Sequence, residues 1–214
     1  MRLEEGDPLW PAQLALAAAI LLNLGLSDRL TIGPVWLLPA IEGAALITLI
    51  AIAPRRVTAA KGGAPRRLAL SVTALVSAAN IVSLALLVHY LVGGGHARGR
   101  ALIGSGALLW LTNVLLFAVW YWEMDRGGPL ARYRGTVIMA DFQFPQMENP
   151  QLAPPNWRPG FGDYLYVSLT NATAFSPTDT MPLTVSAKLV MGLQSLSALV
   201  TVGLVVARAV NILS

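Results

Sequence analysis

The C-terminal part of the chain joins an apolar run that can cross a membrane to a shorter run that cannot. Leu183–Leu213 contains only Lys188 and Arg208 as charged residues and is long enough to cross a hydrocarbon core of about 30 Å. Gly162–Thr173 would form only about 18 Å of helix. A polar kink, Ala174–Pro182, separates the two runs. Because irregular backbone at membrane depth must be buried in protein or line a wet cavity, this order predicts a re-entrant helix beside a pore.

The composition indicates a membrane protein. Hydrophobic residues make up 55% of the chain and charged residues 12%, which is about half the charged share of a soluble domain. The net charge of +4 comes mostly from arginines beside apolar runs, so we interpret it as a topology signal and expect no nucleic-acid partner. We predict an integral protein of a prokaryotic-type plasma membrane, in contact with the lipid bilayer. The chain has no cysteine, which excludes disulfides and thiolate metal sites.

The expected fold is all-α and polytopic, with five membrane-crossing helices and one re-entrant pore helix. Residues 1–100 form a three-helix N-terminal region, and residues 101–214 form a pore-like module. The three N-terminal apolar runs are Trp10–Leu26, Pro34–Ala53 and Leu68–Val92. The parts of the module are an outer helix 101–122, a Pro-rich loop 123–160, a re-entrant pore helix 162–173, a filter-like segment 174–182 and an inner helix 183–213.

The pore-like module resembles the pore module of the potassium-channel superfamily. The residues that carry the resemblance are Asp163-Tyr164-Leu165-Tyr166-Val167-Ser168, Thr170, Thr173, Asp179, Pro182 and Ala207-Arg208. In that family a pore helix of the type D-x-L-Y-F-S-x-x-T-x-x-T leads into a T-V-G-Y-G-D filter, a short linker and the inner helix. The resemblance implies a pore-loop architecture in which 101–122 is the outer helix.

The filter itself departs from the family pattern. Thr173 falls at the filter threonine, but Ala174-Phe175-Ser176-Pro177-Thr178 replaces the V-G-Y-G stretch and contains no glycine. Glycine supplies the backbone angles that aim successive carbonyls at an ion, and Pro177 has its φ held near −65°. The resemblance therefore implies the architecture and not potassium selectivity.

Hydroxyl and carboxylate side chains follow the predicted pore helix. The candidate pore residues are Thr170, Thr173, Ala174, Phe175, Ser176, Pro177, Thr178 and Asp179. Hydroxyls and carbonyls can replace part of the hydration shell of an ion, and a ring of Asp179 side chains would attract cations. The negative end of the pore-helix dipole favours cations as well. The alternative is that Ser176–Asp179 is an ordinary turn.

The inner helix carries small and hydroxylated residues. Gly192 or Gly203 could act as a gating hinge, and Ser197 and Thr201, four residues apart on one helix face, could line a cavity. The alternative is that these residues permit close packing between helices.

Glu42 is a carboxyl group near the middle of the second apolar run. Such a group costs about 2.5–3.5 kcal/mol on insertion scales, so it must be paired, protonated or functional. The candidate partners at similar depth are Asn23, Asn80 and Asn113. One interpretation is a neutral glutamic acid bonded to an asparagine, and the other is proton or ion sensing.

The loop 123–160 is Pro-rich and aromatic, a composition that disfavours helices and strands. It is either a solvated turret around the pore mouth or a cap over the entrance.

The orientation of the protein in the membrane stays open, because two signals disagree. The basic loop Arg55–Arg67 places this side in the cytoplasm by the positive-inside rule, whereas the potassium-channel resemblance places it outside.

These features predict a cation channel for monovalent or divalent ions, built as a homotetramer because one module cannot close a pore. The alternatives are a non-conducting scaffold or accessory subunit of the same shape, and a proton-coupled carrier that uses Glu42. No motif indicates an enzyme, and neither a cofactor nor a metal site is expected. His89 and His96 lack metal-ligand spacing.

Overall fold

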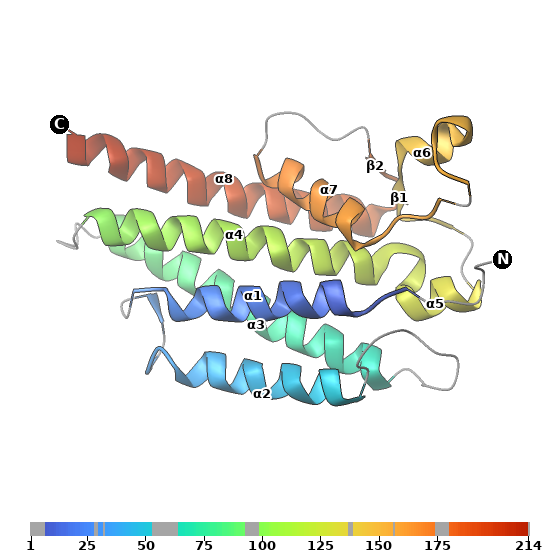
Figure 1. The fold of residues 1–214 in the computed structure, drawn as a ribbon. Helices are drawn as coiled ribbons and strands as arrows, with labels where there is room; N and C mark the ends of the chain where they lie inside the picture. Colours follow the sequence, from blue (N-terminus) through green and yellow to red (C-terminus); the bar gives the residue numbers. More distant parts are fainter. Residues whose placement is uncertain are drawn as a thin grey trace.

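Long helices form a bundle along one common direction (Figure 1). The structure, a computed structural model, describes residues 7–27, 30–31, 33–52, 64–92, 99–136, 139–155, 157–173 and 180–213. The long helices are α1 (Trp10–Leu24), α2 (Leu37–Ile52), α3 (Ala64–Val92), α4 (Gly99–Met124) and α8 (Val185–Leu213). The shorter α7 (Phe161–Thr173) packs beside α4 and α8. The predicted mainly helical fold is confirmed.

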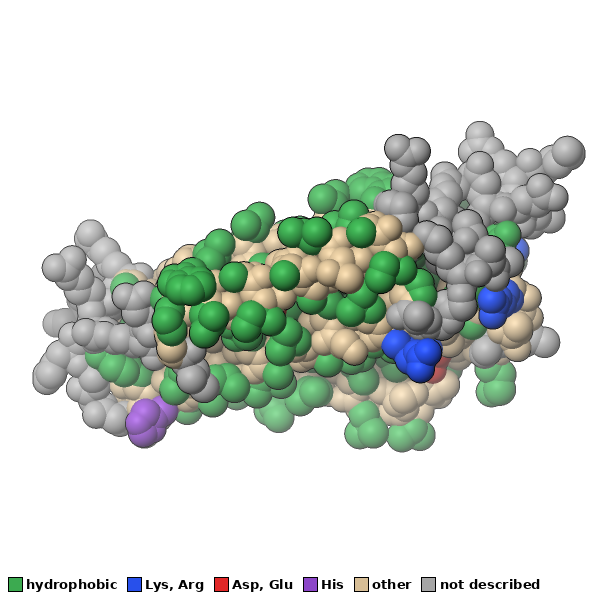
Figure 2. All heavy atoms as spheres, turned by 90° about the horizontal axis from the view of Figure 1, so that it is seen from below, with side chains coloured by type: hydrophobic (Ala, Val, Ile, Leu, Met, Phe, Trp, Pro, Cys, Tyr) green, Lys and Arg blue, Asp and Glu red, His purple; other side chains and the backbone are tan. Residues whose placement is uncertain are grey.

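Three helices of the described chain are long and apolar enough to cross a membrane: Pro65–Leu91, Ala101–Arg134 and Val185–Arg208. The other two apolar helices, α1 and α2, have 15 and 16 residues, which corresponds to about 23 Å of helix. Figure 2 shows a flank of the bundle covered with hydrophobic side chains, with Lys and Arg near one end. These features indicate an integral membrane protein.

Helix α4 is the centre of the bundle. It packs against α1, α3, α7 and α8. In the apolar 18-residue stretch that could cross a membrane, 56% of α4 is buried inside the chain, compared with 17% of the corresponding stretch of α8. A glycine permits the close contact with α8, because a Cβ at Gly106 would collide with the Val205 side chain. Helix α4 therefore contacts both the N-terminal helices and the other two helices of the pore-like module.

The loop 123–160 contains regular structure, which corrects the expectation that its prolines exclude it. Its elements are η2 (Asp125–Gly127), α5 (Pro129–Arg134), β1 (Phe142–Gln143), α6 (Pro145–Glu148) and η3 (Pro150–Leu152). Pro129, Pro145 and Pro150 each occupy the first turn of a short helix. A missing N–H costs little there, because first-turn donors have no partner inside the helix.

The same loop is joined to the start of α8 by a short antiparallel sheet, which the all-α prediction did not include. Strand β1 pairs with β2 (Met181–Pro182), and Phe142 lies opposite Pro182. The side chain of Phe142 is fully buried, with its ring centroid 5.2 Å from that of Tyr121, and Phe144 lies 5.4 Å from the Tyr164 ring. The interpretation as a solvated turret is therefore wrong for these aromatic residues, since their burial attaches the loop to the bundle.

Replacing Phe142 by alanine is expected to lower the free energy of unfolding by about 3–5 kcal/mol, because a buried aromatic side chain leaves a cavity. The measurement is unfolding by SDS titration in mixed micelles. Leu152→Ala is the control, since Leu152 is 82% exposed, and its effect should stay within about 0.5 kcal/mol. Equal losses in the two variants would contradict a packed loop.

Candidate functional site

Helix α7 begins beside the C-terminal end of α4. The rings of Phe161 and Trp122 meet edge to face with their centroids 6.1 Å apart, and the Tyr164 hydroxyl donates to Asp125 Oδ2 at 2.6 Å. These contacts place the first turn of α7 at the end of the bundle that holds α5 and the short sheet (Figure 1).

Helix α7 has 13 residues and ends near the middle of α4. There the Trp110 indole Nε1 donates to the backbone oxygen of Ala172 at 3.3 Å. At Leu183 the chain is again at the end of the bundle where α7 begins. The Leu183 N–H donates there to the backbone oxygen of Asp141 at 2.8 Å. The chain therefore begins both α7 and α8 at the same end of the bundle.

Gln194 of α8 connects the three helices of this module. Its fully buried side-chain oxygen accepts hydrogen bonds from the Tyr121 hydroxyl of α4 and from Asn171 Nδ2 of α7. Its Nε2 donates to the backbone oxygen and the hydroxyl of Ser168, at 2.9 and 2.7 Å. The Ser168 hydroxyl donates in turn to the Val114 backbone oxygen of α4 at 2.7 Å. The network fixes the rotation of α7 about its own axis, because water does not compete for these buried hydrogen bonds.

The Asn171 side chain extends this network along α8. Its Nδ2 also donates to the Met191 backbone oxygen at 3.0 Å, and its Oδ1 accepts from the Ser195 hydroxyl at 2.9 Å. The amide of Asn171 thus has partners for both its donor and its acceptor. Neither Gln194 nor Asn171 was predicted as a site residue from the sequence. The signal that could have identified them is an uncharged amide at matching depth in each of two neighbouring apolar helices.

The predicted pore threonines lie at the end of α7. The Thr170 hydroxyl donates to the backbone oxygens of Tyr166 and Val167, and the Thr173 hydroxyl donates to the backbone oxygen of Thr170 at 2.9 Å. Both hydroxyls therefore bond within their own helix. The other candidates lie outside the described residues: Ala174, Phe175, Ser176, Pro177, Thr178 and Asp179.

The inner-helix candidates divide between two faces of α8. Ser197 and Thr201 share a face, but it packs toward α4, since the Ser197 hydroxyl accepts from Asn113 Nδ2 at 2.8 Å and Thr201 is buried. This position favours the packing alternative over a cavity lining. Gly192 and Gly203 are exposed, and a Cβ on either would meet nothing within 4 Å.

A buried carboxylate, Asp125, holds the loop and α7 together. Its Oδ1 accepts from the backbone N–H groups of Asp141 and Phe142 at 2.8 and 3.4 Å, and its Oδ2 accepts from Tyr164. Burial raises the pKa of the Tyr164 phenol above its ordinary value, so the phenol keeps its proton and acts as the donor. Asp125 was not among the residues predicted from the sequence.

Asp141 continues this cluster to α8. Its Oδ2 accepts from the backbone N–H of Arg126, and its Oδ1 accepts from the Thr184 hydroxyl at 2.6 Å. The Thr184 oxygen in turn accepts from the N–H of Ala187 and so caps the N-terminus of α8. Arg126 has a φ of 51°, a strained conformation that the cluster maintains.

Arg132 closes the cluster from the other side. Its guanidinium pairs with Asp7 at 2.9 Å, donates to the backbone oxygens of Trp122 and Asp125, and lies over the rings of Trp122 and Tyr164. These charges connect the N-terminal segment, α4, α5 and α7. In the part of the chain that the structure describes, no three His, Asp or Glu side chains gather as a metal site would require.

Glu42 is fully buried in α2, and its side-chain neighbour is Asn23. The other two predicted partners bond elsewhere: Asn80 Nδ2 donates to the Leu109 backbone oxygen at 3.3 Å, and Asn113 donates to Ser197. Glu42 therefore belongs to the N-terminal helices and lies apart from the Gln194 network.

Replacing Gln194 by leucine is expected to speed amide hydrogen exchange in peptide 161–173 by about tenfold or more, because α7 loses its hydrogen bonds to α8. Exchange followed by mass spectrometry on detergent-purified protein measures the effect. Thr170→Val is the matched control, since that hydroxyl bonds only to its own helix. Unchanged exchange in Gln194→Leu would contradict the role of this network.

No family model matches the chain, and neither a curated protein nor a solved structure matches it.

Proposed function

We propose that the chain is a subunit of a cation-conducting, pore-loop channel, with α4 as outer helix, α7 as re-entrant pore helix and α8 as inner helix. The path of α7 carries this proposal. The helix has 13 residues, begins at one end of α4, and reaches only the level of Trp110 before the chain returns. About 20 Å of helix ends inside a hydrocarbon core of about 30 Å. Backbone beyond such an end must be covered by protein or line a wet cavity.

The end of α7 favours positive ions. The last carbonyl oxygens of a helix lack partners within it and carry the negative end of the helix dipole. Thr173 is the last residue of α7, and Asp179 follows six residues later in the chain. We propose that the segment 173–179 surrounds the conduction axis, with Asp179 supplying the charge that attracts cations.

A ring of identical subunits would complete the pore. One face of α8 contains Leu189, Gly192, Leu196 and Gly203, and it is exposed along its length. The hydrogen bonds of Gln194 use the opposite face of the helix, so the exposed face is free to turn toward an axis. We propose a homotetramer in which this face lines or borders the central path.

The remaining helices would form the periphery of each subunit. We propose that α1 and α2 cross the membrane together with α3, α4 and α8, which makes five crossings. Their length of about 23 Å is a few ångströms short of the hydrocarbon core, and local thinning of the bilayer accommodates such a mismatch at modest cost.

Asp179→Asn is expected to lower cation flux into liposomes by about fivefold. The variant loses the attraction between the carboxylate and a cation, which is about 1 kcal/mol in water and corresponds to that factor. The readout is cation uptake by vesicles that contain purified protein. Glu148→Gln removes an exposed charge of the 123–160 loop and is expected to leave the flux unchanged.

Cryo-EM of the same preparations provides the second readout. A fourfold ring with no flux would identify a non-conducting subunit, and a monomer with no flux would contradict both the channel and its assembly.

A further inference from the structure

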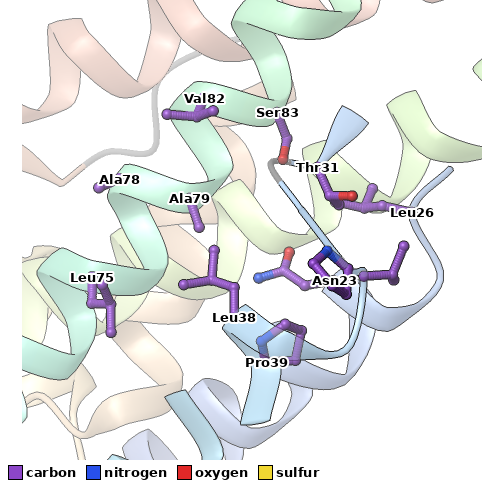
Figure 3. A pocket seen from close by; sticks show the side chains of 12 residues that line it. Asn23, Leu26, Thr31, Leu38, Pro39, Leu75, Ala78, Ala79, Val82 and Ser83 are labelled. Atoms are coloured by element: carbon purple, nitrogen blue, oxygen red, sulfur yellow. The ribbon is translucent and has the colours of Figure 1, made fainter. Parts of the chain in front are cut away.

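A cavity of about 180 Å³ lies between α1, α2 and α3, outside the pore-like module. Most of its wall is apolar, formed by residues such as Leu38, Pro39, Leu75, Ala79 and Val82. Figure 3 shows Asn23 from the end of α1 directed into this space, between the α2 and α3 side chains. Asn23 is thus one of three polar side chains, with Thr31 and Ser83, in a mostly apolar lining.

The Asn23 amide is not satisfied by the chain. Asn23 is 6% exposed, and its Nδ2 has no hydrogen-bond partner among the described residues. Glu42, one helical turn beyond the lining residue Pro39, is the side chain beside Asn23 and does not itself line the cavity. Buried polar groups in proteins are almost always hydrogen-bonded, so an amide donor that faces a cavity without a partner indicates that a bound molecule supplies one.

The mouth of the cavity lies on the surface of the bundle. Leu75, Ala78 and Val82 line the cavity and are also exposed on α3, one of the helices long and apolar enough to cross a membrane. Side chains at this position face the acyl chains of lipids. A ligand therefore enters sideways from the bilayer, which selects for molecules that dissolve in lipid.

We propose that this cavity binds a small, uncharged lipophilic molecule with one hydroxyl group, of the phenol or alcohol class. The volume is slightly larger than the roughly 150 Å³ apolar cavity that holds benzene in a known engineered protein, so one ring with a small substituent fits. A hydroxyl oxygen can accept a hydrogen bond from Asn23 Nδ2, which lines the cavity. An ion is excluded because the surrounding walls are apolar.

The test uses 4-fluorophenol and fluorine NMR on the detergent-purified full chain. Ala79→Leu fills part of the cavity and is expected to weaken binding by about tenfold or more, because its larger side chain occupies volume that the probe needs. Ala85→Leu adds the same volume on the exposed face of α3 and is the matched control, with unchanged affinity. Measurements on Ala85→Leu also correct for partition of 4-fluorophenol into the detergent micelles. Ala78→Leu at the mouth replaces Ala79→Leu if the latter does not fold.

Recognition of the hydroxyl is tested separately with Asn23→Leu. This variant is expected to bind 4-fluorophenol about fivefold more weakly through loss of one hydrogen bond, and to bind fluorobenzene as the wild type does. Absence of saturable binding in the wild type, or equal affinity in the cavity-filling variant and Ala85→Leu, overturns the site. An equal loss for both probes in Asn23→Leu overturns the role of the amide. Both readouts are independent of ion flux.

Discussion

The hydrogen bonds of Gln194 are the interaction on which the C-terminal half of the structure depends. Helix α7 has only 13 residues and an exposed face that includes Tyr166. Gln194 compensates for this by joining α7 to both of its neighbours, through Tyr121 of α4 and through Ser168 and Asn171 of α7. In an environment without competing water, such amide contacts are directional, so they define one position and one rotation of the helix.

The charged cluster around Asp125 performs the corresponding task at the end of the bundle. One carboxylate accepts from α7 through Tyr164 and from the loop through Asp141 and Phe142. Asp141 then reaches α8 through Thr184. The entry to α7 and the start of α8 are thereby held to the same scaffold, which is what a chain that enters and leaves at one end requires.

Two regions of the molecule therefore have separate roles in our interpretation. In the α4–α7–α8 module the side chains of the Gln194 network bond to one another, and in our proposal the chemistry belongs to the end of α7 and to the residues after it. The N-terminal helices differ, because among the described residues Asn23 Nδ2 has no hydrogen-bond partner and faces a cavity. Satisfied networks position the backbone, whereas unsatisfied groups beside a space indicate a ligand. The two proposals thus rest on different residues.

Helix positions could be predicted from the apolar runs, because a membrane requires long uncharged stretches to be helical. The half-length helix was expected at 162–173 and lies at Phe161–Thr173. The loop could not be predicted in the same way. Its prolines suggest irregular chain, but proline is also the natural first residue of a helix, and only burial of Phe142 and Phe144 decides between the two.

Apolar and polar runs along the chain were enough to predict that it is mainly helical, apolar enough for a membrane, and interrupted by one helix too short to cross. Which face each polar residue takes depended on how the helices pack. This packing turned Ser197 and Thr201 toward α4, gave Asn80 and Asn113 other partners, and left Asn23 beside Glu42. The physical reason is that hydropathy depends on composition along the chain, whereas hydrogen-bond partners depend on the rotation of packed helices, which distant residues set together.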